Sequence, residues 1–372
     1  CRSFVELTDN LKTSSFLVEK RVDIFPREPE TWNEFFEKLG YRLDFVDIIS
    51  PQNSFQGVYQ LEDVSLKENF IPDGFLLGSF KIEESNFEKI AEKNISPEGY
   101  GDNKLAYLKM DADNMGNIFR KLSDMERERE GLALTRYGIL SRRIELFFGK
   151  EVLKIIKEKP KGTIYPVFIG GDDLLLIGAY NEINDLAKEI REKYYEYTGS
   201  KEIFTISGGI SYFSDNFPLI RGTRILEEVL EKAKNFVYPE EDKPKKDKIC
   251  VEGEVLSYKE YQEALNLAEE ITQKILKTDE KNKVSRAIIS KIEKSIKGFN
   301  PLLEQSLKRK ISPPAVWRFM YYLRDQKEIA ERLANIIMDN LLREGEKIKN
   351  PRFILVATKI AKMKTRKLEG GR

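Results

Sequence analysis

Histidine is absent from this chain of 372 residues, and cysteine occurs only twice, as Cys1 and Cys250. Without imidazole there is no histidine general base, no His-containing catalytic triad and no metal centre that needs His ligands. Two cysteines are too few for a disulfide framework or an all-cysteine zinc site, and such low use is typical of a reducing compartment. Any chemistry here must therefore rely on carboxylates, hydroxyls, amines and bound cations.

The sequence also lacks an apolar run long enough to span a membrane and an N-terminal signal segment. With 34% charged and 41% hydrophobic residues it is typical of a soluble globular protein, and we expect a cytoplasmic location. Its length predicts two or three domains. The formal net charge is only +1, so the total charge does not indicate non-specific binding to nucleic acid.

The most informative feature is the acidic turn Gly170-Gly171-Asp172-Asp173, which lies between the apolar runs 164–169 and 174–177. Apolar strands around a Gly pair predict a β-hairpin. Taken alone, the aspartates are most simply a polar turn. However, ionised carboxylates beside buried hydrocarbon need compensation, and no Lys or Arg occurs between Ile164 and Tyr180. A divalent cation is the expected counterion.

The pattern around this hairpin predicts an α+β fold. The predicted elements follow the order βαββαβ of a ferredoxin-like palm. They are a strand at 105–111, a long helical stretch at 114–157, the two hairpin strands, a helix at 182–197 and a strand at 203–213. A further helix is predicted at 218–236. In this topology the first strand lies beside the third, which places Asp111 next to Asp172 and Asp173. Three carboxylates at one site predict a two-metal centre for Mg²⁺ or Mn²⁺.

Three regions are expected along the chain. Residues 1–94 are predicted to form a small mixed α/β linker region, with strands at 21–25, 43–49 and 75–82 and a helix at 32–39. The palm is predicted at 95–254, ending in a charged connector at 238–248. Residues 255–372 are predicted to form an all-helical domain with helices at 261–276, 284–296, 316–323 and 329–342, interrupted only by a strand-like run at 353–356.

Four other features allow two interpretations each. The turn after Asp111 offers backbone amides and Gly116 for phosphate binding, or Asp113 or Asn114 as a helix N-cap. Ser207-Gly208-Gly209 makes room for a nucleobase or for neighbouring packing. Lys232 and Lys234 either reach a triphosphate or only interact favourably with the dipole at a helix end. The basic stretch 359–367 either contacts nucleic acid or is a solvated helix end.

Four motifs in this order resemble the large, polymerase-like subunit of type III CRISPR effector complexes. They are LKMDADNMGNIF (108–119), FIGGDDLLLIG (168–178), TISGGI (205–210) and EKAKN (231–235). The resemblance is to the second palm domain and the C-terminal helical domain, and the form DADN is closer to the Csm-type subunit of subtype III-A. Residues 1–7 resemble the end of the zinc-knuckle linker of that family, whose earlier cysteines would precede this chain.

The resemblance implies a nucleotidyltransferase that makes cyclic oligoadenylates from ATP with Mg²⁺ or Mn²⁺ when target RNA binds. It implies that Asp111 and Asp173 are metal ligands and that Asp172 lies near the attacking 3′-hydroxyl. The metal set predicted from strand order contains all three aspartates, which are also the predicted catalytic residues. The predicted nucleotide-binding residues are Ala112, Asp113, Asn114, Met115, Gly116, Gly170, Gly171, Ser207 and Lys234.

The same resemblance implies as partners the other subunits of the complex, with guide RNA and target RNA bound through it. The nuclease domain and first palm of that family would lie upstream. Neither is expected here, and a chain without histidine cannot carry the histidine-aspartate nuclease motif. Two alternatives remain at this stage. One is a GGDEF-like diguanylate cyclase acting on GTP, although Asp173-Leu174 replaces its Glu-Phe. The other is a catalytically silent scaffold subunit.

Overall fold

The computed structural model describes most of the central and C-terminal parts of the chain. The continuous stretches are 86–127, 133–200, 202–238, 244–276, 284–296 and 352–368. Strands at 16–21, 41–46, 57–61 and 74–76, Glu34 and separate positions between 320 and 335 are also described. None of the helices in these parts is long and apolar enough to cross a membrane.

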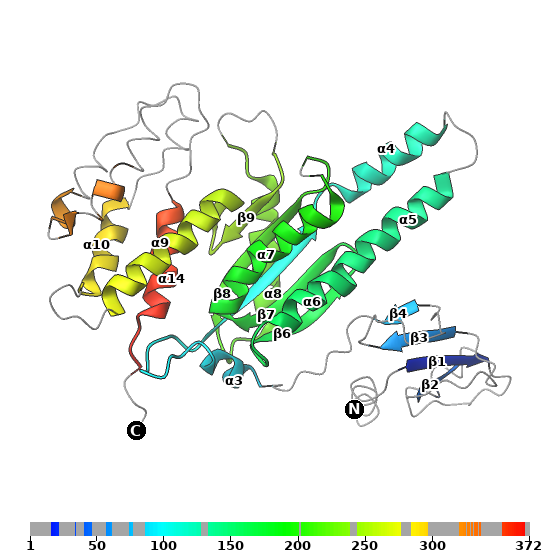
Figure 1. Cartoon of the computed structure of the whole chain (residues 1–372), viewed down its shortest axis with the longest axis horizontal. Helices are drawn as coiled ribbons and strands as arrows, with labels where there is room; N and C mark the ends of the chain where they lie inside the picture. Colours follow the sequence, from blue (N-terminus) through cyan, green and yellow to red (C-terminus); the bar gives the residue numbers. More distant parts are fainter. Residues whose placement is uncertain are drawn as a thin grey trace.

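The larger sheet has six strands in the order β10-β9-β8-β5-β7-β6, antiparallel except for the parallel pair β8–β9 (Figure 1). The first predicted strand therefore lies between the third and fourth, which confirms the predicted palm topology. The strands are β5 (Lys104–Ala112), β6 (Ile164–Gly170), β7 (Asp173–Ala179), β8 (Ile206–Ser214), β9 (Lys248–Val251) and β10 (Glu254–Ser257).

Helices connect these strands as the periodicity predicts, with one difference. The predicted helical stretch at 114–157 is divided into α4 (Met115–Arg127), α5 (Ala133–Leu146), the π-helical turn η1 (Phe147–Glu151) and α6 (Val152–Glu158). The helix predicted at 182–197 is α7 (Tyr180–Thr198), and the helix predicted at 218–236 is α8 (Leu219–Asn235). A short helix, α3 (Phe87–Glu92), precedes the sheet.

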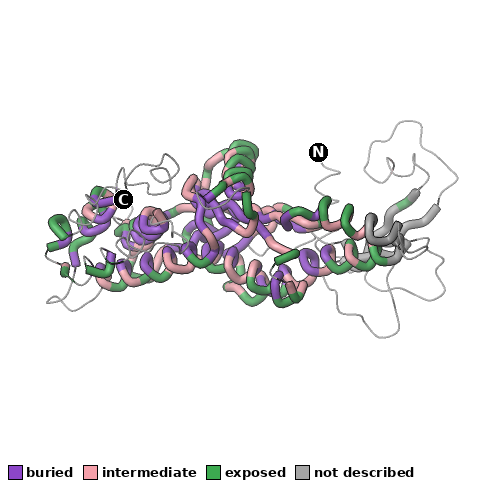
Figure 2. Tube along the Cα trace, turned by 90° about the horizontal axis from the view of Figure 1, so that it is seen from above, coloured by how far each residue is buried: buried purple, intermediate pink, exposed green. Residues whose placement is uncertain are grey.

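Alternation along β5 divides the buried side chains between the two faces of the sheet. Leu105 and Tyr107 pack with α3 and α8, whereas Leu108 and Met110 belong to the larger core on the other face. That core also includes buried residues of η1, α6 and α7. Buried residues are concentrated in this middle part of the molecule (Figure 2).

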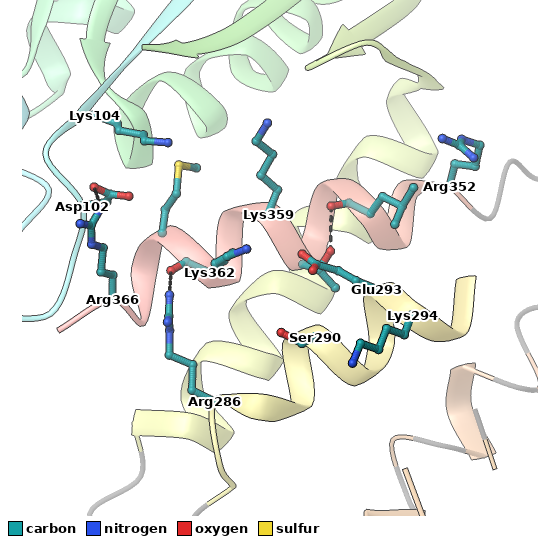
Figure 3. Close-up of a pocket in the computed structure, with 13 residues that line it drawn as sticks. Asp102, Lys104, Arg286, Ser290, Glu293, Lys294, Arg352, Lys359, Lys362 and Arg366 are labelled. Carbon is teal, nitrogen blue, oxygen red and sulfur yellow. Dashed lines mark hydrogen bonds and ion pairs between the residues drawn. The ribbon is translucent and has the colours of Figure 1, made fainter. Parts of the chain in front are cut away.

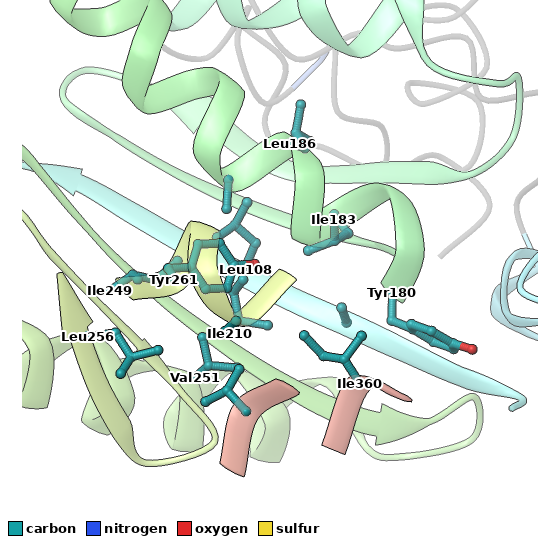
Figure 4. Packing of buried hydrophobic residues seen from close by; sticks show 14 of the residues in the cluster. Leu108, Tyr180, Ile183, Leu186, Ile210, Ile249, Val251, Leu256, Tyr261 and Ile360 are labelled. Atoms are coloured by element: carbon teal, nitrogen blue, oxygen red, sulfur yellow. The ribbon is translucent and has the colours of Figure 1, made fainter. Parts of the chain in front are cut away.

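The same core continues into the helical region without a break. Tyr261 of α9 (Tyr258–Leu276) and Ile360 of α14 (Phe353–Lys364) belong to one cluster with Leu108, Ile210 and Ile249 of the sheet (Figure 4). A further helix, α10 (Ala287–Ile296), packs against α14. The predicted boundary between palm and helical domain, at 254/255, falls inside β10 and remains a prediction.

Two sequence predictions in this part were wrong. The run at 353–356 is the first turn of α14 and not a strand. A short apolar run does not distinguish a strand from a buried helix, and the burial of Phe353, Ile354, Val356 and Ala357 follows the helical repeat. The second error is that no strand was predicted after the charged connector at 238–248. Lys248 begins β9, and β10 extends the sheet into the start of the region that was predicted to be all-helical.

The N-terminal region contains a separate four-stranded sheet in the order β2-β1-β3-β4. Of the strand predicted at 21–25, only Arg21 is among the described residues, as the last residue of β1, and β3 was not predicted. The predicted strands at 43–49 and 75–82 overlap β2 and β4, and Glu34 is helical as expected. Most of the helices predicted at 316–323 and 329–342 lie outside the described residues. The strands are β1 (Phe16–Arg21), β2 (Tyr41–Val46), β3 (Gly57–Leu61) and β4 (Gly74–Leu76).

The contact between α8 and the sheet depends on Gly222. A Cβ at this position would lie 2.6 Å from the ring of Tyr107, which is fully buried. We expect Gly222→Ala to lower the free energy of unfolding by about 1–3 kcal/mol, because the ring and helix must separate. Chemical denaturation monitored by circular dichroism measures this change.

Gly138 in α5 provides a matched control, since a Cβ there meets no heavy atom within 4 Å. Gly138→Ala should stabilise the protein by about 0.5–1 kcal/mol through helix propensity. Equal effects of the two substitutions would show that the close approach of Gly222 to Tyr107 does not matter.

Candidate functional site

The strand register places two of the predicted carboxylates opposite each other. Asp111 of β5 pairs with Asp173 of β7 and, on its other side, with Ser207 of β8. The amide of Ala112 donates to the carbonyl oxygen of Asp172 at 2.8 Å, so Ala112 and Asp172 form a hydrogen-bonded pair. Because the two kinds of pair alternate along antiparallel strands, Asp111 and Asp173 form a non-hydrogen-bonded pair. Side chains lie closest together in such pairs. The predicted meeting of β5 with the hairpin is confirmed.

The hairpin turn consists of two residues, Gly171 and Asp172. Gly171 has a φ of 64°, and Asp172 is not among the residues with positive φ, which is the pattern of a type II′ turn. Gly170 is the last residue of β6 and pairs with Asp173. The glycine at the first turn position therefore fixes the tight reversal that carries Asp172 to the tip.

Helix α8 and strand β5 supply the positive charge of this edge. Lys109 and Asp111 lie on the face of β5 that packs on α8. Lys109 forms an ion pair with Glu227 of α8, and the Nζ of Lys234, also in α8, lies 2.8 Å from a carboxylate oxygen of Asp111. Glu227 and Lys234 are seven residues apart, which places them on one face of the helix. The absence of basic residues from the hairpin therefore does not by itself require a metal counterion, because a distant segment contributes the amine.

Burial and mutual repulsion affect the titration of this edge. Burial raises the pKa of Asp111, and the charge of Asp172 adds to this, which together outweigh the hydrogen bond and charge of Lys234. Burial also raises the pKa of Asp173, with Lys109 opposing it and Asp111 and Asp172 reinforcing it. Burial alone would lower the pKa of the Lys234 amine, but the Asp111 carboxylate raises it overall.

Asp113 has a structural position that the sequence did not indicate. It is 2% exposed, and its Oδ2 accepts hydrogen bonds from Thr205 Oγ1 (2.9 Å), Ser207 Oγ (3.0 Å) and the amide of Asp247 (3.1 Å). The predicted N-cap role is therefore wrong for Asp113. Ser207 is also fully buried, so the burial of both side chains argues against their direct contact with a nucleotide.

The two glycines after Ser207 serve packing in this structure. A Cβ on Gly209 would lie 3.0 Å from the backbone nitrogen of Leu230 in α8, and one on Gly208 would lie 3.2 Å from the hydroxyl of Tyr258. Of the two interpretations of this segment, the geometry favours close packing. Lys232 donates to the carbonyl oxygen of Gly253 at 3.3 Å, away from the acidic edge.

The turn from Ala112 to Gly116 exposes backbone beside the carboxylates. Asn114 adopts a φ of 59°, and its carbonyl oxygen accepts from the amides of Asn117 and Ile118 at the start of α4. Ala112 and Met115 are buried, whereas Asn114 and Gly116 are exposed, and a Cβ on Gly116 would meet nothing within 4 Å. The beginning of α4 is thus open to an approaching anion.

A pocket of about 950 Å³ extends from Asn114 between α4, α5 and residues 202–204. Its apolar lining includes Ile118, Leu140 and Phe204, and its basic lining includes Arg120, Lys121, Arg136 and Arg143. Apart from Asn114, sequence reasoning missed these residues because they come from three separate segments. The spacing of Arg136 and Arg143, seven residues apart in α5, is the one signal that could have indicated a shared face.

The carboxylates of this edge are hard oxygen donors of the kind that Mg²⁺ prefers. Within the described ranges, however, no three or more His, Cys, Asp or Glu side chains are arranged to hold a metal ion. The predicted three-carboxylate set is therefore not assembled in this structure. The cross-strand pair Asp111 and Asp173 fits a site in which water and substrate phosphates complete the shell, as is usual for Mg²⁺.

The antiparallel βαββαβ sheet and its acidic edge define a palm domain. Residues 104–250 match the family description "Cas10/Cmr2, second palm domain". The chain is 30% identical over 279 residues to the single-strand-specific deoxyribonuclease Cas10/Csm1 (subtype III-A) of Methanocaldococcus jannaschii, a match that covers 66% of this chain and 34% of the relative. The corresponding protein of Streptococcus thermophilus is 27% identical over 186 residues, covering 49% and 23%.

Solved structures show the same fold at lower identity. Csm1 of T. onnurineus has a TM-score of 0.66 at 17% identity and covers 98% of this chain and 51% of its own. A Csm1–Csm4 cassette in complex with cA3 has a TM-score of 0.64 at 17% identity, with coverage of 98% and 50%. Residues 104–250 belong to the Cas10/Cmr2 second-palm family, and the chain, which is similar to Cas10/Csm1 proteins of subtype III-A, spans about a third of the length of the first of these curated relatives.

The raised pKa of Asp173 makes its charge unfavourable in the folded state. Such a group stabilises the fold below its unfolded pKa, and this stabilisation is lost as pH rises through the folded pKa. We expect Asp173→Asn to raise the Tm at pH 7 by about 1–3 °C, and the difference should disappear below about pH 4. Differential scanning calorimetry across this pH range measures the effect.

Asp185→Asn on α7 is the matched control, because Asp185 is exposed and is not among the charges that shift the pKa of Asp173. It should leave the Tm nearly unchanged. A lower Tm for Asp173→Asn with an unchanged Asp185→Asn protein would contradict the repulsion argument.

Proposed function

We propose that this palm takes part in ATP-dependent nucleotidyl transfer that yields cyclic oligoadenylates, within a type III CRISPR complex activated by target RNA. The observation that supports this most directly is the Asp111–Asp173 pair beside Lys234 and the open start of α4. Carboxylates, an amine and the backbone amides at the start of a helix are the groups that phosphoryl chemistry uses for binding and charge stabilisation.

Each group has a separate role in this proposal. Asp111 and Asp173 would hold Mg²⁺ or Mn²⁺, which when bound activates a hydroxyl and neutralises phosphate charge. Lys234 would bind a phosphate oxygen as a point charge, from the position where Asp111 now holds it. Asp172, at the tip of the turn, would lie beside the attacking 3′-hydroxyl, and the turn 112–116 would bind phosphate through its backbone.

The pocket between α4 and α5 would receive the rest of the nucleotide. It begins at Asn114, close in sequence to Asp111, and combines apolar side chains with arginines. Apolar walls suit the faces of a nucleobase, and a small number of polar groups fixes its orientation. The buried hydrogen bonds of Asp113 would keep the turn in place without touching the ligand.

Structural relatives solved with adenine nucleotides support the choice of ATP. Csm1–Csm4 cassettes have been solved in complex with cA3, with cA4 and with one ATP. These proteins share the fold at 16–18% identity and are about twice as long as this chain. Partnership with a Csm4-type subunit and with guide and target RNA is part of the same proposal.

A double substitution tests the site in the full-length protein, assembled with guide RNA and cognate target RNA and supplied with ATP and Mg²⁺ or Mn²⁺. We expect Asp172→Ala with Asp173→Ala to reduce cyclic oligoadenylate formation at least 100-fold, because ligand and orienting carboxylates are lost together. Mass spectrometry of the nucleotide products gives the readout.

The matched control combines Asp185→Ala with Glu228→Ala, two exposed carboxylates on α7 and α8, and it should retain full activity. Unchanged products from the Asp172/Asp173 variant would refute the site. A dominant cyclic dinucleotide from GTP would favour a diguanylate cyclase. Absence of heat on calorimetric titration with ATP and Mn²⁺ would favour a scaffold.

A further inference from the structure

A basic groove lies between α10, α14 and the residues that lead into β5 (Figure 3). It encloses about 870 Å³ and is lined by residues within 102–104, 286–294 and 352–366. Seven of the lining residues are Lys or Arg and two, Asp102 and Glu293, are acidic; when Glu252 and Glu254, which pair with two of the basic residues, are also counted, an excess of three positive charges remains. The whole chain has a formal net charge of only +1, so this groove concentrates positive charge.

Four of the seven basic side chains are fixed by partners within the protein. Their interactions join α14 to the β9–β10 hairpin and to the segment before β5, and they join α10 to α14. Arg352 pairs with Glu254, Lys359 with Glu252, and Arg366 with Asp102 at 2.9 Å, while Arg286 donates to the carbonyl oxygen of Lys362 at 2.9 Å. The walls of the groove are therefore held in place.

The other three basic side chains are lysines from three different elements. Lys104 begins β5, Lys294 is in α10 and Lys362 is in α14. Among the described residues, none of these three amines has an ion pair or a side-chain hydrogen bond. Figure 3 shows them on separate sides of the groove. Three amines without counterions around one hollow produce a field that favours a polyanion.

The side chains of the groove indicate the chemistry of that polyanion. No aromatic residue lines it, so there is no surface on which a base would stack. The arginines Arg352 and Arg366, whose planar forks suit carboxylates, are already paired with Glu254 and Asp102. What remains is lysine, a compact charge that binds phosphate oxygens without a fixed orientation. Phosphates therefore fit better than the carboxylates of an acidic peptide.

The dimensions favour a single strand. From Arg352 to Arg366 the groove follows α14 for about 20 Å at 1.5 Å per residue, enough for several successive phosphates. A hollow of about 870 Å³ has room for only a few nucleotides of one strand, whereas the major groove alone of a B-form duplex is about 12 Å wide. A duplex would therefore meet only the rim of the groove, whereas the backbone of one strand can lie in it.

We infer that the basic groove binds the phosphodiester backbone of a single-stranded nucleic acid, independently of base sequence. This site is separate from the acidic edge, because Lys104 and Asp111 lie toward opposite ends of β5, seven residues and about 24 Å apart. The inference does not depend on the proposed nucleotidyl transfer. It assigns a role to the basic stretch at 359–367, which belongs to α14 and the residues just after it.

Neutralising the three lysines tests this inference in the full-length protein. The variant combines Lys104→Gln, Lys294→Gln and Lys362→Gln, and the probe is fluorescein-labelled oligouridylate or oligothymidylate, measured by anisotropy at several salt concentrations. Loss of three phosphate contacts should weaken binding of both probes about tenfold or more near 0.1 M salt and reduce the salt slope by about 2.

The control variant changes the same number of charges at Lys154, Lys188 and Lys193, each of which already pairs with a Glu in its own helical segment. It should bind both probes like the unmodified protein. Equal affinities of the two variants would overturn the inference. So would a selective loss of polyglutamate binding in the Lys104/Lys294/Lys362 variant, which would assign the groove to an acidic protein partner.

Two further measurements separate this result from loss of the fold or of the acidic site. The Lys104/Lys294/Lys362 variant should keep the Tm of the unmodified protein and the same ATP affinity by calorimetry. The Asp172/Asp173 double variant should bind the oligonucleotides normally. If it lost the oligonucleotide as well, the groove would not be the site of binding.

Discussion

The register of β5 between β7 and β8 is the constraint on which this site depends. It places Asp111 opposite Asp173 on one side and Ser207 on the other. A slip of one residue would turn Asp111 to the opposite face and bring Met110 or Ala112 to the edge. The apolar alternation of β5 prevents such a slip, because Leu105 and Tyr107 must remain under α8. The core therefore determines where the carboxylates point.

Helix α8 connects this buried pattern with the charges at the edge. Its contact with Tyr107 through Gly222 determines how closely it approaches the sheet. From that position Glu227 reaches Lys109, and Lys234 reaches Asp111. Burial that stabilises the sheet also withdraws water from Asp111 and Asp173 and raises their pKa. The buried charges of this edge are thus locally unfavourable, and the packing of the surrounding core offsets them, as is common at functional sites.

Local sequence signals were sufficient for the centre of the fold. The hairpin, the helices α7 and α8 and the meeting of Asp111 with the acidic turn followed from apolar runs, turn residues and the rules of strand connection. What failed depended on contacts between distant segments. The buried role of Asp113 needs Thr205 and Asp247, and the pocket beside α4 needs residues from α5 and from 202–204. Neither has a signature within a single segment.

The strand wrongly predicted at 353–356 shows that local signals can also be ambiguous, since four consecutive apolar residues are compatible with both a strand and a buried helix. The helix that forms there places Ile360 in the same core as Leu108 and Ile249. This shared core has a consequence for how the molecule is divided. A fragment cut at 254/255 would lose β10 and uncover Val251 and Ile210, both almost fully buried. Because the palm shares its core with α9 and α14, we expect a fragment of the palm to fold stably only when both helices are retained.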